Sequence, residues 1–151
     1  MSVEVPRTPM RMRDKIVLRV VSKGLIPLIF LFALYVQFHG DFGPGGGFQA
    51  GVLFASGVVL YGLIFGLDAA HQLMPPRVVE VGLSVGVLMF AGMGVLTVAL
   101  GGNYLDYDAL QPHHPAHGQH WGILWIELGV GVTVTFAMIA IFYMFAGRVR
   151  R

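Results

Sequence analysis

Four long apolar stretches dominate this sequence, at residues 16–38, 48–67, 79–100 and 121–146. An α-helix rises about 1.5 Å per residue, and the hydrocarbon core of a bilayer is about 30 Å thick. About 20 apolar residues therefore cross a membrane, and each stretch is that long. The sequence predicts an all-α integral membrane protein with four transmembrane helices.

Composition agrees with a membrane protein and excludes several classes of function. Hydrophobic residues make up 56% of the chain and charged residues only 12%, which is too apolar for an ordinary soluble domain. Because the chain has no cysteine, it has no disulfide framework and no thiolate metal site. No cofactor motif or pairing of nucleophile and base is evident, so we expect no cofactor, no enzymatic chemistry and no nucleic-acid binding.

The distribution of Lys and Arg predicts the orientation of the spans. All ten Lys and Arg residues fall in the N-terminal region up to Lys23, in the loop that holds Arg77, or at the C-terminus. Four spans place these three regions on one side of the membrane, and the positive-inside rule makes that side cytoplasmic. We therefore expect a cytoplasmic tail at 1–15, a four-helix membrane domain at 16–147 and a basic cytoplasmic C-terminus at 148–151.

A glycine-rich segment, residues 39–51, separates the first two spans. Glycine adopts positive φ at little cost and lets other backbones approach closely, so this segment is predicted to be a shaped turn. Neither the Gly-Lys-Ser/Thr of a Walker loop nor a soluble strand before the glycines is present, which argues against a phosphate cradle. The residues expected to form a structural motif are Pro44, Gly45, Gly46, Gly47, Phe48 and Gly51.

Small residues also recur at helical spacing within the spans, and such rows let neighbouring helices come close. Packing within the chain and packing against other subunits both remain open. The rows are Gly47, Gly51 and Ala55, then Gly62 and Gly66, then Gly82 and Gly86.

Three elements of the sequence, in this order, resemble the MnhB or MrpB family, whose members are small membrane subunits of the multisubunit Na⁺/H⁺ antiporters. They are Pro-Gly-Gly-Gly-Phe-Gln-Ala-Gly at 44–51, Gly-Gly-Asn-Tyr-Leu-Asp-Tyr at 101–107 and Glu-Leu-Gly-Val at 127–130. The resemblance covers nearly all of the chain after the N-terminal tail.

The resemblance implies an accessory membrane subunit of a multisubunit antiporter that exchanges cytoplasmic Na⁺ for external H⁺ in a bacterial or archaeal plasma membrane. It implies partners that include large subunits similar to the membrane subunits of respiratory complex I, with this chain needed for assembly and lining part of the ion path. Homologous subunits of membrane-bound hydrogenases and ferredoxin-linked complexes leave a redox-driven parent complex as the alternative.

Glu127 is the sharpest candidate for ion coupling. It lies six residues after Trp121, roughly 9 Å along a helix that begins there. Ionisable groups inside a membrane usually face a protein interior or a water-filled cavity, and proton relays use them. The alternative is a carboxylate at the head-group boundary or bonded to a neighbouring helix.

Three further residues allow both a functional and a structural interpretation. Asp41 and His39 flank the glycine run and are candidates for a cation or proton entry site, although a turn role is favoured for Asp41. A structural role is favoured for Asp106, which lies in the element matched to the family.

Four histidines in the loop 101–120 are weak candidates for metal binding or for sensing external pH: His113, His114, His117 and His120. Prolines interrupt the loop, and these histidines are not part of the family pattern. A solvated loop without a metal site is therefore predicted.

Overall fold

The computed structural model describes residues 15–40, 45–111 and 113–148. Within those ranges the chain is helical and contains no strand, as predicted. Four of its helices are long and apolar enough to cross a membrane. The elements in order are α1 (Ile16–Phe38), α2 (Gly47–Phe65), α3 (Leu67–Leu73), α4 (Pro76–Ala99), the 3₁₀ helix η3 (Tyr107–Leu110) and α5 (Pro115–Arg148).

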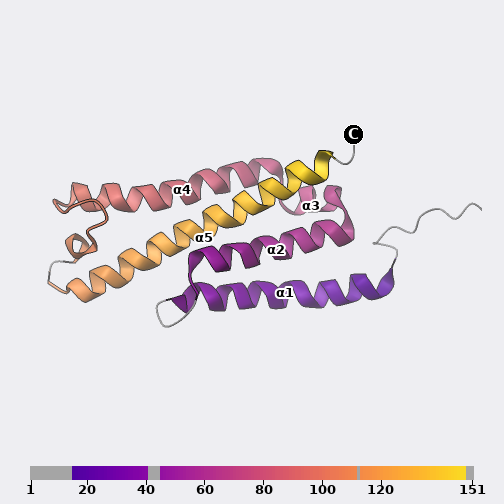
Figure 1. Ribbon diagram of the computed structural model, residues 1–151, viewed down its shortest axis with the longest axis horizontal. Coiled ribbons are helices and arrows are strands. Elements are labelled where there is room, and N and C mark those ends of the chain that lie inside the picture. Colours follow the sequence, from indigo (N-terminus) through magenta and orange to yellow (C-terminus); the bar gives the residue numbers. More distant parts are fainter. Residues whose placement is uncertain (1–14, 41–44, 112, 149–151) are drawn as a thin grey trace, which may run out of the picture.

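The long helices lie side by side in the order α1, α2, α5, α4 (Figure 1). α5 is therefore the central helix, because it contacts both α2 and α4, while α1 lies at the edge and packs mainly against α2. With 34 residues α5 is about 51 Å long at 1.5 Å per residue, longer than a hydrocarbon core of about 30 Å. In Figure 1 it crosses the other helices at an angle.

Glycines on α2 bring this helix close to α5. A Cβ atom built on Gly47 would overlap the backbone carbonyl oxygen of Glu127, and one built on Gly51 would lie 2.7 Å from the carbonyl oxygen of Gly131. Both glycines are buried. Without side chains at these two positions the helix backbones touch, so this predicted row of small residues packs within the chain.

The Gly82 and Gly86 row on α4 packs against the opposite face of α5. A Cβ atom on Gly82 would meet the ring of Phe136, and one on Gly86 would meet the hydroxyl of Thr133. Gly66 is different, because α2 ends before it and its φ is 99°. Nothing lies within 4 Å of a Cβ built on Gly66. Its predicted role in helix packing is therefore wrong, and it forms the turn into α3.

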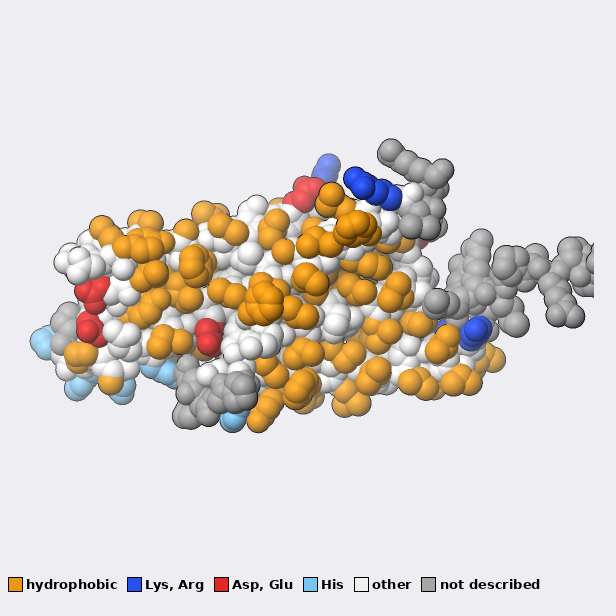
Figure 2. Space-filling view, in the orientation of Figure 1, with side chains coloured by type: hydrophobic (Ala, Val, Ile, Leu, Met, Phe, Trp, Pro, Cys, Tyr) orange, Lys and Arg blue, Asp and Glu red, His pale blue; other side chains and the backbone are white. Residues whose placement is uncertain are grey.

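The two ends of the helix assembly differ in charge. Basic side chains gather where α1 and α4 begin and α5 ends, and we call this the basic end (Figure 2). They are Lys15, Arg19, Lys23, Arg77 and Arg148. The four histidines at 113–120 and the described part of the glycine-rich segment lie toward the opposite end, which we call the glycine-rich end. Hydrophobic side chains cover much of the face between the two ends (Figure 2).

A buried apolar cluster and a tyrosine hold the helices together toward the basic end. Ala55, Val58, Val79 and Ile139 come from α2, α4 and α5 and form the cluster. Beside it, the Tyr143 hydroxyl lies 3.0 Å from the Ala70 carbonyl oxygen and 2.9 Å from the Met74 carbonyl oxygen. One phenolic proton therefore serves two carbonyl groups at the end of α3.

Two connections contain more helix than the sequence indicates. α3 occupies part of the connection between the second and third spans, and η3 lies in the longest loop. α5 begins at Pro115, not near Trp121, because proline suits the first position of a helix, where its missing N–H has no partner to lose.

Candidate functional site at the junction of α1, α2 and α5

The described glycines of segment 39–51 lie where α1 ends and α2 begins. The Gly46 N–H donates a hydrogen bond of 3.2 Å to the Val36 carbonyl oxygen in the last turn of α1. Gly46 has a φ of 109° and a ψ of −178°, a backbone conformation open essentially to glycine alone. α2 then begins at Gly47, and Asp41 and Pro44 lie outside the described residues.

The Glu127 carboxylate lies against the backbone of this turn. A Cβ atom on Gly40 would be 2.9 Å from both carboxylate oxygens, and a Cβ atom on Gly46 would be 2.9 Å from Oε1. Two positions without side chains therefore form the surface on which the carboxylate rests. Glu127 lies about 18 Å along α5 from Pro115 at 1.5 Å per residue, twice the separation expected from a start at Trp121.

Gln37 enters the same junction from the last turn of α1, and it was not among the candidates predicted from the sequence. Its side chain is only 5% exposed. A Cβ atom built on Gly131 would lie 2.7 Å from Gln37 Oε1, so the amide faces α5. Among the described residues no group accepts a hydrogen bond from the buried Nε2. The available signal was an amide side chain in the otherwise apolar stretch 24–38 of this span, because polar groups inside a membrane tend to face protein.

Toward the basic end, Thr135 of α5 adds a further polar side chain to this junction. Its hydroxyl lies 2.7 Å from the Gly131 carbonyl oxygen and 3.3 Å from the Gly51 carbonyl oxygen of α2. One turn further on, Ile139 is fully buried in the apolar cluster. The polar face formed by Glu127, Gln37 and Thr135 therefore ends at apolar packing.

The other candidates of the glycine-rich segment lie around this junction. His39 caps α1, and its exposed ring stacks on Tyr35 at a centroid separation of 4.9 Å. A Cβ atom on Gly45 would lie 2.9 Å from the Val36 carbonyl oxygen. Phe48 points outward and is 61% exposed. The glycine positions thus shape the turn, whereas the phenyl ring of Phe48 is turned away from the chain's own helices.

Asp106 belongs to a separate network in the loop between α4 and η3. Its carboxylate accepts a long hydrogen bond of 3.4 Å from the Asn103 N–H. In the last turns of α4, the buried Thr97 hydroxyl donates to the Gly94 carbonyl oxygen at 2.9 Å and accepts from the Leu105 N–H of this loop at 3.0 Å. Leu105 has a φ of 63°, so Thr97 holds a backbone turn that leucine rarely adopts.

Tyr107 fastens η3 to the first turns of α5. A Cβ atom on Gly122 would meet the Tyr107 ring, and one on Gly118 would lie 2.5 Å from the Tyr107 carbonyl oxygen. Burial raises the pKa of the Tyr107 phenol above its usual value, and Tyr104 adds to the rise through like charge. This loop is therefore packed on α5.

The four histidines do not converge. His113 and His114 precede α5, while His117 and His120 lie in its first turns. The rings of His114 and His117 have centroids 5.9 Å apart. All four side chains are exposed, and within the described ranges no three metal-ligating residues form a group that could hold a metal ion.

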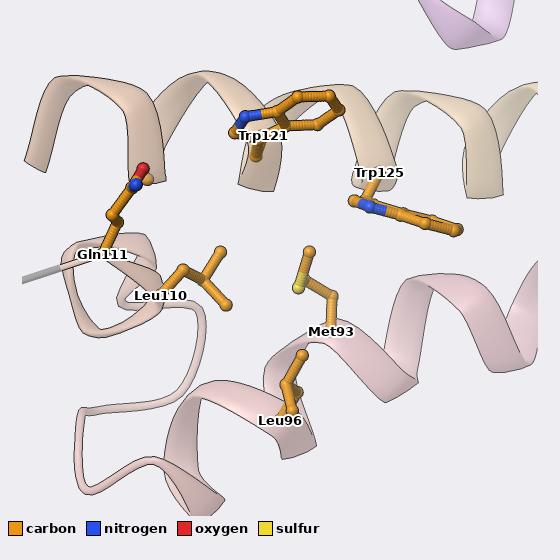
Figure 3. A pocket seen from close by; sticks show the side chains of 7 residues that line it. Met93, Leu96, Leu110, Gln111, Trp121 and Trp125 are labelled. Carbon is orange, nitrogen blue, oxygen red and sulfur yellow. The ribbon is translucent and has the colours of Figure 1, made fainter. Parts of the chain in front are cut away.

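An apolar pocket of about 220 Å³ opens between α4, η3 and α5 (Figure 3). Trp121 and Trp125 line it from α5, and Met93 and Leu96 line it from α4. It joins an apolar groove of about 350 Å³ along α4. Gln111 is its one polar side chain, so the pocket suits hydrocarbon and offers little to an ion.

Comparison with known proteins identifies relatives over most of the chain. A family model described as a domain related to the MnhB subunit of Na⁺/H⁺ antiporter matches residues 17–140. A protein named "Putative antiporter subunit mnhB2" from Staphylococcus haemolyticus strain JCSC1435 is 29% identical over 134 residues, which cover 83% of this chain and 94% of the relative. A protein of the same name from Staphylococcus aureus strain Newman is 28% identical over 134 residues, which again cover 83% of this chain and 94% of the relative.

Proposed function

Since this chain belongs to the family of domains related to the MnhB subunit of Na⁺/H⁺ antiporters, we propose that it is an accessory membrane subunit of a multisubunit Na⁺/H⁺ antiporter. Its four apolar helices and its relatives make it a multi-pass membrane protein. Its partners are the other subunits of that complex, including large complex I-like membrane subunits. The relatives carry antiporter names, which does not favour a redox-driven parent complex.

The proposed orientation rests on charge. The described Lys and Arg residues all lie at the basic end, which matches the positive-inside pattern. Both termini are then cytoplasmic, and the glycine-rich end faces outward from a bacterial or archaeal plasma membrane. Glu127 then lies on the side from which external protons enter the antiporter.

An assembly role is supported by the exposed apolar surface. α1 leaves Leu28, Leu31 and Phe32 more than half exposed, although it is a full-length apolar helix. In a membrane this surface contacts lipid or another subunit, and packing of apolar helices there is driven by close fit. The central position of α5 leaves one face of α1 and one face of α4 for such packing.

A role for this chain in the ion path is supported by one observation: the Glu127 carboxylate lies against Gly40 and Gly46. Carboxylates inside membrane helices are costly unless they face protein or water, and they are common in proton relays. The glycine turn gives this carboxylate a partly buried position where a bound proton, or its loss, changes the local charge. We propose that Glu127 takes part in ion coupling.

The test compares Glu127→Gln with the native chain in membrane vesicles that carry the whole antiporter. Glu80→Gln, an exposed carboxylate near the start of α4, is the matched control. We expect Glu127→Gln to abolish most Na⁺-dependent antiport while the complex assembles normally, and Glu80→Gln to retain it. Full antiport with Glu127→Gln would remove this residue from the ion path, and loss of assembly would assign it to packing.

A further inference from the structure

Gln37 is a buried amide whose hydrogen-bond donor faces the inside of this chain. The side chain is 5% exposed, and within the described residues its Nε2 has no acceptor. Buried polar groups in proteins are nearly always hydrogen-bonded, either to protein or to an ordered water. Because α2 and α5 of the same chain cover the amide, another subunit has little access to it.

The amide lies next to the position of the Glu127 carboxylate. Gln37 Oε1 would be 2.7 Å from a Cβ on Gly131, and Gly131 follows Glu127 by one helical turn on the same face of α5. Gly47 contacts the backbone of both α5 residues, since a Cβ built there would meet the Glu127 carbonyl oxygen and lie 3.0 Å from the Gly131 nitrogen. The Glu127 carboxylate lies against Gly40 and Gly46, and the Gln37 amide lies against Gly131 beside Gly47, so the two polar groups border consecutive residues at the start of α2.

We propose that Gln37 holds a water molecule against the Glu127 carboxylate at the junction of α1, α2 and α5. A water that bridges two polar groups makes one hydrogen bond of roughly 2.8 Å to each of them. The Nε2 group is a donor, so it requires an acceptor such as the oxygen of water. A cation would bind the amide through Oε1 and would leave Nε2 without an acceptor.

The surrounding residues limit where this water comes from. Thr135 prolongs the polar face by one turn beyond Gly131, and Ile139 and the apolar cluster then close it. This apolar packing closes the path for water from the basic end. Gln37 acts as a positioning residue, because it acts on the carboxylate through the water. The water site stands independently of the proposed function, whereas its use in transport depends on it.

The test is a high-resolution cryo-electron microscopy map of the complete complex, native and with Gln37→Met. Methionine keeps the length of the side chain but has no N–H donor. We expect a water peak between Gln37 Nε2 and the Glu127 carboxylate in the native map and its loss in the variant. Gln72→Leu, which changes an exposed glutamine on α3, is the control and retains the peak.

Infrared spectroscopy of the same samples provides the second readout. The carboxyl band that disappears in Glu127→Gln belongs to Glu127, and we expect Gln37→Met to shift it, which a purely structural role would not do. A native map with no peak, a protein carbonyl in its place, or a peak whose presence depends on Na⁺ would overturn the proposal. If the variant fails to assemble, the native map alone decides.

The two proposals fail in different ways. A water peak that depends on Gln37, together with full antiport in Glu127→Gln, would reject the role of Glu127 in transport and keep the water site. Loss of antiport in Glu127→Gln, together with a native map that has no water peak, would reject the water site and keep the role of Glu127 in transport.

Discussion

Gly47 and Glu127 are in direct backbone contact: a methyl group on Gly47 would overlap the carbonyl oxygen of Glu127. This contact joins the first turn of α2 to the middle of α5. It also fixes where along α5 the Glu127 side chain meets the glycine residues before α2. The geometry of the candidate site therefore depends on a residue that has no side chain.

Gly47→Ala is expected to separate α2 from α5. Overpacking typically costs about 1–3 kcal/mol, and here the clash is with backbone, which yields least. We expect less assembled complex and a lower melting temperature of what remains. Gly92→Ala on α4 is the control, because nothing lies within 4 Å of its added Cβ. An equal loss with Gly92→Ala would show that the effect does not come from the contact with Glu127.

Thr97→Val is expected to loosen the loop between α4 and η3. The change removes the acceptor for the partly buried Leu105 N–H, and loss of one such hydrogen bond costs about 0.5–1.5 kcal/mol. Hydrogen exchange at the Leu105 amide should accelerate. Thr97→Ser keeps the hydroxyl and should preserve protection. Unchanged exchange in Thr97→Val would mean that other contacts hold this loop.

Tyr143→Phe is expected to release the end of α3 from α5. The lost hydroxyl serves the carbonyl oxygens of Ala70 and Met74, and one such hydrogen bond contributes about 0.5–1.5 kcal/mol. Amide exchange in α3 should increase, while the exchange of α2 stays the same. Tyr61→Phe on α2 is the control, since its hydroxyl has no hydrogen bond to the described residues. Equal effects of the two changes would contradict a specific role for Tyr143.

Replacing His113, His114, His117 and His120 together with Gln is expected to leave the dependence of antiport on external pH unchanged. The four side chains are exposed, and the ring centroids of His114 and His117 are 5.9 Å apart. Antiport rates at external pH values from 5 to 8 measure this, since unperturbed histidines titrate in that range. A shifted profile in the variant would establish the pH-sensing role that the structure does not favour.

The number and positions of the spans were predictable because length and apolarity decide them. The first predicted span, 16–38, coincides with α1, and the second and third differ from α2 and α4 by a few residues. The start of the fourth was wrong, because the histidine-containing stretch after Pro115 reads as loop by polarity although it continues α5. Polarity marks the membrane boundary, and a helix does not have to end there.

The neighbours of each helix were not predictable in the same way. In a membrane both lipid and protein interiors are apolar, so hydrophobic periodicity does not show which face is packed. The glycine rows indicated close approach, but not that α5 is the common partner of α2 and α4. Glu127 was identified because it is charged, whereas Gln37 was overlooked because its polarity carries no charge.

The central position of α5 has a consequence for biosynthesis. α5 leaves the ribosome after α1, α2 and α4, and it is the helix that connects the α1–α2 pair to α4. Until it inserts, the Gln37 amide and the glycine backbones of α2 lack the cover that α5 provides. Insertion of α5 must therefore complete the packing between the helices made before it, and a nascent chain stalled before α5 would leave the α1–α2 pair and α4 unjoined.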